Sequence, residues 1–218
     1  MVPILGLSNA LRRPASDRVS STAATARERT VLRRALRARR RAVPPREHQR
    51  LSSDLCRNLI SWPGFLHVRR FACFLSNDGE PDLDSLVQRA ASMGKRAHLP
   101  VLHRRRLWFL PYTNSTPMVS NRYGIPEPSA ASAVRTPLAA IDIALVPLVA
   151  FDDYGRRLGM GGGYYDRTFA YLRHREHWRR PKLIGVAFEF QRVAELPAQP
   201  WDVPLDGIIT EKGLLLPR

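Results

Sequence analysis

The sequence lacks an apolar stretch long enough to cross a membrane. Its most apolar segment, residues 141–151, is interrupted by Asp142 and Pro147 and is shorter than the ~18 consecutive apolar residues that a spanning helix needs. The 218 residues also include only two cysteines, Cys56 and Cys73, without a CxxC pair. Sparse cysteines are typical of a reducing compartment. We therefore expect a soluble, cytoplasmic protein with two free, buried thiols.

Acidic residues are scarce relative to basic ones. The chain has 19 acidic and 35 basic residues, a net charge of +16. The excess is uneven, because residues 1–50 contain 13 basic and 3 acidic side chains, whereas the remaining residues contain 22 and 16. Such a basic field attracts polyanions, which include nucleic acid, anionic lipid and phosphorylated small molecules. Composition alone does not choose among them.

The first 26 residues show no sustained helical or strand periodicity. They are rich in Ser, Ala, Thr and Arg and contain one acid, Asp17. We predict a disordered basic extension over residues 1–26, whose composition also suits an organellar transit peptide. The remaining residues, 27–218, have the size of one large domain, and we predict a single domain there.

Helices open the predicted domain, and strands then alternate with helices. Leu32 and Leu36 recur at helical spacing among the arginines that follow Arg27, which predicts a basic amphipathic helix. After two prolines, leucines at every fourth residue from Leu51 predict a second helix. Further strands are predicted at 71–75, 97–102, 107–110, 141–151, 183–188 and 207–210, and further helices at 83–93 and 165–172. This alternation favours an α/β fold with three α/β/α layers and a mostly parallel central sheet.

A glycine-rich segment, RLGMGGGYYD at residues 157–166, lies between a predicted buried strand and a predicted helix. Glycines let backbone N–H groups approach an anion, and the helix directs its positive end toward it. A tight turn by itself would need neither the flanking Arg156 and Arg157 nor Asp166, which suits a hard cation beside phosphate. Tyr164 stands where a dinucleotide motif needs glycine, and no Lys-Ser/Thr pair follows the glycines. The segment therefore predicts a phosphate loop of another type.

The segment RLGMGGGYYDR, preceded by DIALVPLVAFD, resembles the 5-formyltetrahydrofolate cyclo-ligase family, also called methenyltetrahydrofolate synthetase. The likeness extends over residues 29–212 and includes FLSNDGEPD, KRAHLPVL, YGIPEP and PWDVPLDGIITEKG in the order of the family. The resemblance implies ATP-dependent closure of 5-formyltetrahydrofolate to 5,10-methenyltetrahydrofolate, with Mg²⁺ as cofactor and release of ADP and phosphate. We expect a monomer whose partners are these small molecules, with no membrane or nucleic acid.

The resemblance implies ATP contacts on the basic helix and on the glycine loop. These contacts are Arg29, Arg33, Arg157, Leu158, Gly159, Met160, Gly161, Gly162, Gly163, Tyr164 and Tyr165. Arg157, Tyr164 and Asp166 would be catalytic, and Asp166 and Asp202 would hold Mg²⁺. Two positions depart from the family, because Arg29 replaces a lysine and Gly162 stands where many relatives have one. Another cation, from Arg156, Arg157 or the basic helix, must then supply that charge.

The same resemblance implies the folate contacts. They are Leu75, Glu80, Tyr123, Met160, Gly161, Gly162, Gly163 and Tyr164. A carboxylate such as that of Glu80 suits a pterin, since the 2-amino and N3–H donors pair with two oxygens. Tyr123 would stack near the same site.

Two alternatives follow from other features of the chain. The arginine run at residues 33–41 is typical of an RNA-binding helix, although RNA binding does not explain the glycine loop. Related α/β sheets also serve sugar-phosphate isomerases and coenzyme A transferases, and a fold does not determine a reaction.

Overall fold

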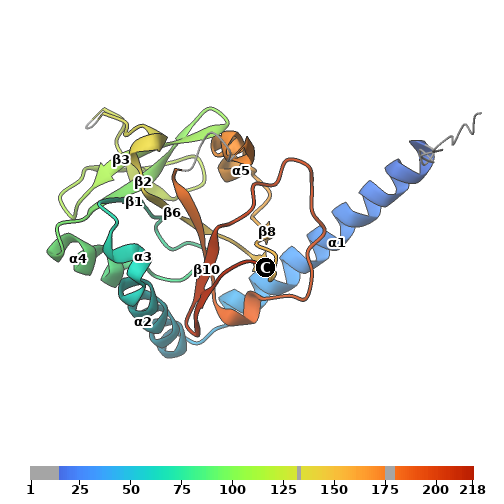
Figure 1. Cartoon of the computed structure of the whole chain (residues 1–218), viewed down its shortest axis with the longest axis horizontal. Helices are drawn as coiled ribbons and strands as arrows, with labels where there is room; N and C mark the ends of the chain where they lie inside the picture. The colour runs from blue at the N-terminus through green and yellow to red at the C-terminus, as the bar shows by residue number, and fades with distance from the viewer. Residues whose placement is uncertain (1–14, 132–133, 175–179) are drawn as a thin grey trace, which may run out of the picture.

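The computed structural model describes residues 15–131, 134–174 and 180–218 (Figure 1). Its α-helices are α1 (Ala15–Arg41), α2 (Pro45–Ser61), α3 (Pro63–Leu66), α4 (Asp84–Ser92) and α5 (Tyr164–Thr168). Short 3-10 helices span Leu138–Ala140, Ala170–His174 and Glu189–Gln191. The strands are β1 (Arg70–Ala72), β2 (Arg96–His103), β3 (Arg106–Tyr112), β4 (Met118–Ser120), β5 (Pro126–Pro128), β6 (Ile143–Pro147), β7 (Ala150–Phe151), β8 (Arg157–Leu158), β9 (Lys182–Val186), β10 (Gly207–Thr210) and β11 (Gly213–Leu215).

A seven-stranded sheet in the order β11-β10-β9-β6-β1-β2-β3 forms the centre of the fold. Strands β2, β1, β6, β9 and β10 pair in parallel, and the two edge strands, β3 and β11, pair antiparallel to their neighbours. Two small hairpins, β4–β5 and β7–β8, lie outside this sheet. The mostly parallel α/β fold predicted from the alternating pattern is confirmed.

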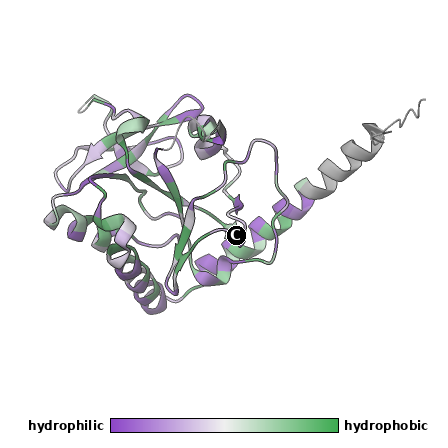
Figure 2. Cartoon of the chain, viewed as in Figure 1, coloured by the Kyte–Doolittle hydropathy of each residue, from purple (hydrophilic) through white to green (hydrophobic). Residues whose placement is uncertain are grey.

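The two faces of the sheet form separate hydrophobic cores because successive side chains of a strand point to opposite faces. In β6, Ile143 and Leu145 belong to the core that contains Leu55 and Leu59 of α2. Ala144 and Val146 belong to the opposite core, which also contains residues of the α5 region. Figure 2 shows hydrophobic central strands and an α2 that has both hydrophilic and hydrophobic residues. Helices thus cover one face, and α5 with the following 3-10 helix contributes to the other.

Helix α1 begins at Ala15 and so includes residues 15–26, which precede the basic helix expected from Arg27. No proline or glycine interrupts the chain between Pro14 and Pro44, and alanine and arginine favour helix. The helix therefore continues beyond its packed C-terminal half, and its N-terminal end extends away from the sheet (Figure 1). Residues 1–14 of the predicted extension lie outside the described residues. None of the helices in the described ranges is long and apolar enough to span a membrane.

Two further element predictions were too long. The strand predicted at 141–151 is divided into β6 and β7, since Pro147 ends β6 and β7 pairs with β8 instead. The helix predicted at 165–172 is the five-residue α5 followed by a 3-10 helix. The glycine loop therefore follows a small hairpin rather than a strand of the central sheet.

Helix α1 crosses the carboxyl edge of the parallel strands. The Arg40 Nη1 atom donates to the carbonyl oxygen of Leu148, just beyond β6, at 3.1 Å. Arg39 lies over the ring of Phe190, beyond β9, at 4.7 Å. Leu32 packs on the small core cluster that also involves β7 and β8. Ligands of open α/β sheets bind at this edge, so α1 brings its arginines to the expected location.

Candidate active site

The glycine loop, residues 159–163, connects β8 to α5. Gly161 has φ +101° and Gly163 has φ +62°, both in the left-handed region that glycine tolerates. The preceding hairpin is held by the fully buried Asp152 carboxylate, which accepts hydrogen bonds from the backbone N–H groups of Tyr154 and Arg156 at 3.0 Å. Because α5 has only five residues, its N-terminus supplies less positive potential than the sequence suggested.

Arg157 is held inside the protein by groups of the chain itself. Only 5% of Arg157 is exposed, and its guanidinium donates hydrogen bonds to an Asp166 carboxylate oxygen and to the carbonyl oxygen of Val203. Burial lowers its pKa, and the nearby Asp166 and Asp202 carboxylates oppose this effect. The Arg157 charge is thus balanced by Asp166. Its hydrogen bonds fix the start of the glycine loop to α5 and to the segment that contains Val203.

Asp202 and Arg29 form a second ion pair, whose charges also act on Arg157. The Arg29 Nη1 atom lies 3.0 Å from Asp202 Oδ2 and 2.7 Å from the carbonyl oxygen of Pro197. The predicted metal ligands, Asp166 and Asp202, therefore both accept hydrogen bonds from arginines. No group of three or more His, Cys, Asp or Glu side chains suited to a metal ion occurs within the described parts of the chain. Mg²⁺ held by Asp166 and Asp202 would therefore need its other ligands from phosphate and water, as Mg²⁺ commonly does.

Two other arginines lie directly on the glycine loop. The Arg33 Nε atom donates to the Gly159 carbonyl oxygen at 2.9 Å, and its guanidinium lies 3.9 Å from the position of a Cβ at Gly161. Arg167 of α5 also contacts the loop, because its Nη2 atom donates to the Gly162 carbonyl oxygen. Neither arginine has a carboxylate partner among the residues described by the structure. Both cations therefore remain available to an anion on the loop.

The ion pairs of the nearby arginines indicate which of them can supply the positive charge that is missing at Gly162. Arg156, one of the predicted substitutes, pairs with Asp152 at 2.7 Å and with Glu195 at 3.1 Å, so its charge is already balanced. Arg157 is buried against Asp166. The prediction that the basic helix supplies the charge is consistent with Arg33, whereas Arg167 was not considered. Its position three residues after Tyr164, on the side of α5 that faces back to the loop, was the available signal.

Glu80 follows β1 and lies in a buried part of the same edge. It is 7% exposed, and its Oε2 atom accepts a hydrogen bond from the Asn77 backbone N–H at 3.3 Å. Its Oε1 atom lies 3.8 Å from Arg40 Nη2. Burial raises the Glu80 pKa to about 7, although the Arg40 charge acts in the opposite direction. A weakly paired buried carboxyl group of this kind is typical of a functional site.

Tyr123 and Tyr164 form an aromatic pair next to the loop. Their hydroxyl oxygens lie 3.1 Å apart, and the Arg122 guanidinium lies 5.1 Å and 5.8 Å from the two ring centroids. Tyr123 is 57% exposed and Met160 is 41% exposed, so both side chains can reach a ligand. The structure thus brings together two of the predicted folate contacts, Tyr123 and Tyr164.

Three predicted contacts have side chains that pack against the hydrophobic cores, Leu158 completely and Tyr165 and Leu75 in part. Leu158 is fully buried in the small cluster beside α1. Tyr165 packs on the core of the second face, where burial raises its pKa, and Leu75 packs on the first. Their spacing in the motif did not reveal this, because neighbouring loop residues can point in opposite directions.

The sequence interpretation missed a cluster of three arginines on Asp78. Arg37, Arg40 and Arg41 each lie within 2.9 Å of an Asp78 carboxylate oxygen. Burial by itself would raise the Asp78 pKa, but the hydrogen bonds from Arg37 and Arg41 hold it well below its usual range. Much of the arginine run therefore contacts the body of the protein, which leaves less of it for RNA.

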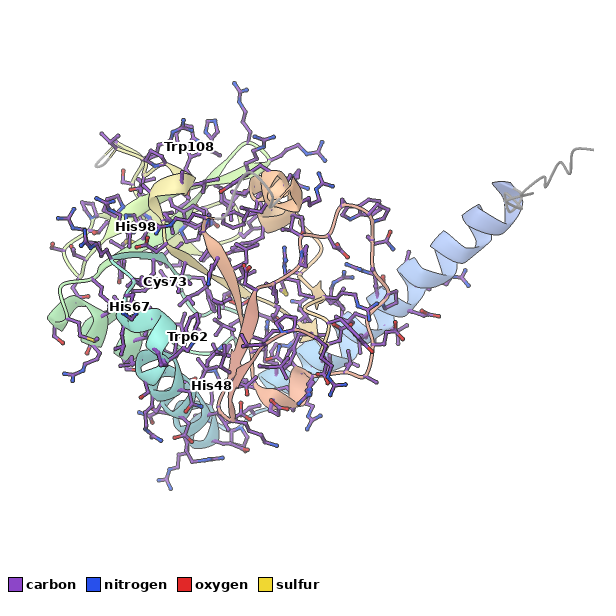
Figure 3. The ribbon with its side chains drawn as sticks, in the orientation of Figure 1. His48, Trp62, His67, Cys73, His98 and Trp108 are labelled. Carbon is purple, nitrogen blue, oxygen red and sulfur yellow. The ribbon has the colours of Figure 1, made fainter. Side chains whose placement is uncertain are left out.

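A groove of about 900 Å³ lies elsewhere, beside β3. Trp108, labelled in Figure 3, stacks on His103 with ring centroids 3.7 Å apart, and four arginines also line the groove. None of the predicted site residues lines it. The carboxyl-edge residues therefore remain the candidate active site.

Gly163→Ala is expected to destabilise the loop. A Cβ at this position would lie 2.7 Å from Arg167 Nη1, and φ +62° is strained for alanine. We expect a loss of about 1–2 kcal/mol, or about 2–8 °C in Tm. Gly159→Ala is the matched control, because its Cβ would meet no atom within 4 Å and its φ is not in the left-handed region. Equal Tm values in thermal unfolding would contradict the expected strain.

Comparisons with known proteins show the family of the chain. The model of the 5-formyltetrahydrofolate cyclo-ligase family matches residues 25–211. The 5-formyltetrahydrofolate cyclo-ligase of Escherichia coli K12 is 39% identical over 178 residues, which cover 80% of this chain and 96% of that protein. The cyclo-ligase of Haemophilus influenzae is 42% identical over 147 residues, which cover 65% and 75%.

A solved structure gives the same result. The NMR structure of Aquifex aeolicus 5,10-methenyltetrahydrofolate synthetase superposes with a TM-score of 0.75 at 30% identity, covering 87% of this chain and 93% of that one. The family match at residues 25–211 includes the strands of the central sheet from β1 to β10, the glycine loop and the C-terminal part of α1. The chain belongs to the 5-formyltetrahydrofolate cyclo-ligase family of enzymes.

Proposed function

We propose that this enzyme uses ATP to close 5-formyltetrahydrofolate into 5,10-methenyltetrahydrofolate, releasing ADP and phosphate. The observation that carries the proposal is the arrangement around one glycine loop. Arg33 and Arg167 contact the loop without a carboxylate partner in the described residues. Glu80 lies beside Arg40, which contacts Met160 of the loop, and Tyr123 pairs with Tyr164 at the end of the loop. Unbalanced cations suit a triphosphate, whereas a carboxyl group and an exposed aromatic ring suit a pterin.

The phosphate side of the proposal depends on positioning and charge. Arg33 and Arg167 hold the triphosphate against the loop, while the left-handed glycines allow close approach of its backbone. Arg157 keeps the loop in place through Asp166 and the Val203 carbonyl group. Asp166 and Asp202 would hold Mg²⁺, which supplies neutralisation of the phosphate charge when bound.

The folate side orients the formyl group toward the phosphate. Ionised Glu80 accepts hydrogen bonds from the pterin 2-amino and N3–H groups. The exposed ring of Tyr123 and the partly buried ring of Tyr164 contact the folate, together with the exposed Met160 side chain. Such alignment of two substrates can provide a large part of a rate enhancement.

The reaction then proceeds in two steps. The formyl oxygen attacks the γ-phosphorus atom, the bond to the bridging oxygen breaks, and ADP leaves. N10 next attacks the activated formyl carbon and loses its proton, and phosphate departs with the former formyl oxygen. Catalysis by the protein is therefore mainly positioning and charge stabilisation.

One assay tests the proposal. Purified protein given 5-formyltetrahydrofolate, ATP and Mg²⁺ is expected to accumulate the absorbing methenyl product together with ADP. Reactions without ATP are the control. No ATP-dependent product would refute the proposal, and tight binding of a sugar phosphate without folate binding would favour the alternative chemistry of a related α/β enzyme. The cytoplasmic location and the monomeric state stay predictions.

A further inference from the structure

Arg40 connects helix α1 to three other segments of the active site, although it is only 1% exposed. Its Nε atom donates to the Asp78 carbonyl oxygen at 2.9 Å, and its Nη2 atom donates to Asp78 Oδ2 at 2.9 Å. Nη1 donates to the Leu148 carbonyl oxygen at 3.1 Å, and Nη2 lies 4.0 Å from Met160 Sδ. One side chain of α1 therefore connects the loop after β1, the end of β6 and the glycine loop.

The Glu80 carboxyl group also lies next to the Arg40 guanidinium. Its Oε1 atom is 3.8 Å from Arg40 Nη2, too far for a hydrogen bond but close enough for a strong electrostatic interaction in a buried region. The only hydrogen bond to the Glu80 carboxyl group from the described residues comes from the Asn77 backbone. Arg40 is thus the main positive charge facing a carboxyl group that otherwise resists ionisation.

We propose that Arg40 is a positioning residue for folate binding, which keeps the Glu80 carboxyl group ionised and aimed at the pterin. The inference rests on the proposed function, because it assigns Glu80 to the substrate. Arg40 itself does not touch the substrate. Its bonds to Asp78 set the orientation of its guanidinium, so Asp78 and Arg40 act together.

Other charged and titratable groups also face Glu80. Arg37 of α1 lowers the Glu80 pKa and Asp78 raises it, both more weakly than burial and Arg40 act. Tyr165 of α5 interacts with Glu80 electrostatically. His48, labelled in Figure 3, hydrogen-bonds the Glu80 carbonyl oxygen through Nε2 at 2.9 Å. A His48→Gln variant separates the titration of His48 from that of Glu80.

The pH dependence of folate use gives the first test. In the native enzyme, Glu80 is protonated below its pKa of about 7, so kcat/KM for 5-formyltetrahydrofolate should fall as the pH drops through 7. Arg40→Met removes the opposing charge at similar length and should move this midpoint upward by about one pH unit. Arg40→Lys keeps the charge and should retain the native midpoint, even if its Tm falls.

Arg41→Met is the matched control. Arg41 also pairs with Asp78, at 2.9 Å, but it is half-exposed and does not face Glu80. Its loss should leave the midpoint unchanged. If Arg40→Met does not fold, Arg40→Gln is the second variant, because it also removes the charge but keeps a hydrogen-bond donor for Asp78 or Leu148, and it should move the midpoint upward in the same way. An unchanged midpoint in Arg40→Met, or equal shifts in Arg40→Met and Arg41→Met, would overturn the proposal.

A second measurement does not depend on the substrate. Carboxyl ¹³C NMR of the free protein, with Glu80→Gln to assign the signal, should show the Glu80 pKa rising in Arg40→Met. If the enzyme makes no methenyl product, the proposed function fails, and the NMR result still decides whether Arg40 controls Glu80. An NMR shift without a change in the folate profile would overturn the assignment of this pair to folate binding.

Discussion

Replacing Asp166 with asparagine is expected to lower kcat roughly 100-fold while the fold stays intact. Asp166 balances the guanidinium of Arg157, which is 5% exposed, and a neutral amide leaves that buried charge without its partner. Arg157 then no longer holds the glycine loop in one position. An amide also cannot balance Mg²⁺ as a carboxylate does. Steady-state kinetics at saturating ATP, with circular dichroism of the same sample, measure the effect.

A surface acid provides the control for Asp166→Asn. Asp153 forms an ion pair with Arg192 at 2.7 Å, on the hairpin that precedes the glycine loop. Asp153→Asn should change kcat by less than about twofold, because exposed ion pairs contribute little. Magnesium titration adds a second readout, in which Asp166→Asn should require more Mg²⁺ for half-maximal rate. Native kcat in a folded Asp166→Asn enzyme would remove Asp166 from the active site.

Arg33→Ala is expected to raise KM for ATP by about 10- to 100-fold, with a much smaller effect on KM for 5-formyltetrahydrofolate. The guanidinium contacts the Gly159 carbonyl oxygen and lacks a carboxylate partner in the described part of the chain. Burial and the charges of Arg29 and Arg37 lower its pKa, which indicates a site where cations are crowded until an anion binds. A charge-assisted hydrogen bond to phosphate would be lost with the side chain.

The adjacent residue gives a direct control for Arg33. Arg34 is exposed and has the same chemistry, so Arg34→Ala should leave both KM values close to those of the native enzyme. Initial rates measured over a grid of both substrate concentrations separate the two constants. If Arg33→Ala raised both KM values equally, Arg33 would have a general structural role instead of a role in ATP binding.

The order of the major elements could be predicted because hydrophobic periodicity is a local property. Leucines at every fourth residue predicted α2, and the alternating strands and helices predicted a mostly parallel sheet. The division of residues 141–151 could not be predicted, since β7 exists through pairing with β8. The length of α1 was also missed, because the weak amphipathic pattern before Arg27 does not exclude a helix that extends into solvent.

The sequence by itself determined the α/β class, the glycine loop and, through its motifs, the family. Those features depend on local periodicity and on consecutive residues. Only the tertiary structure decided which charges are balanced: Arg157 on Asp166, Arg40 on Asp78, and Arg33 and Arg167 on the loop without an acid in the described residues. Folding brings α1 into contact with segments more than a hundred residues away, for example Arg33 with Gly159, which is 126 residues further along the chain. Electrostatic interactions depend on these distances and on burial, which one-dimensional spacing does not contain.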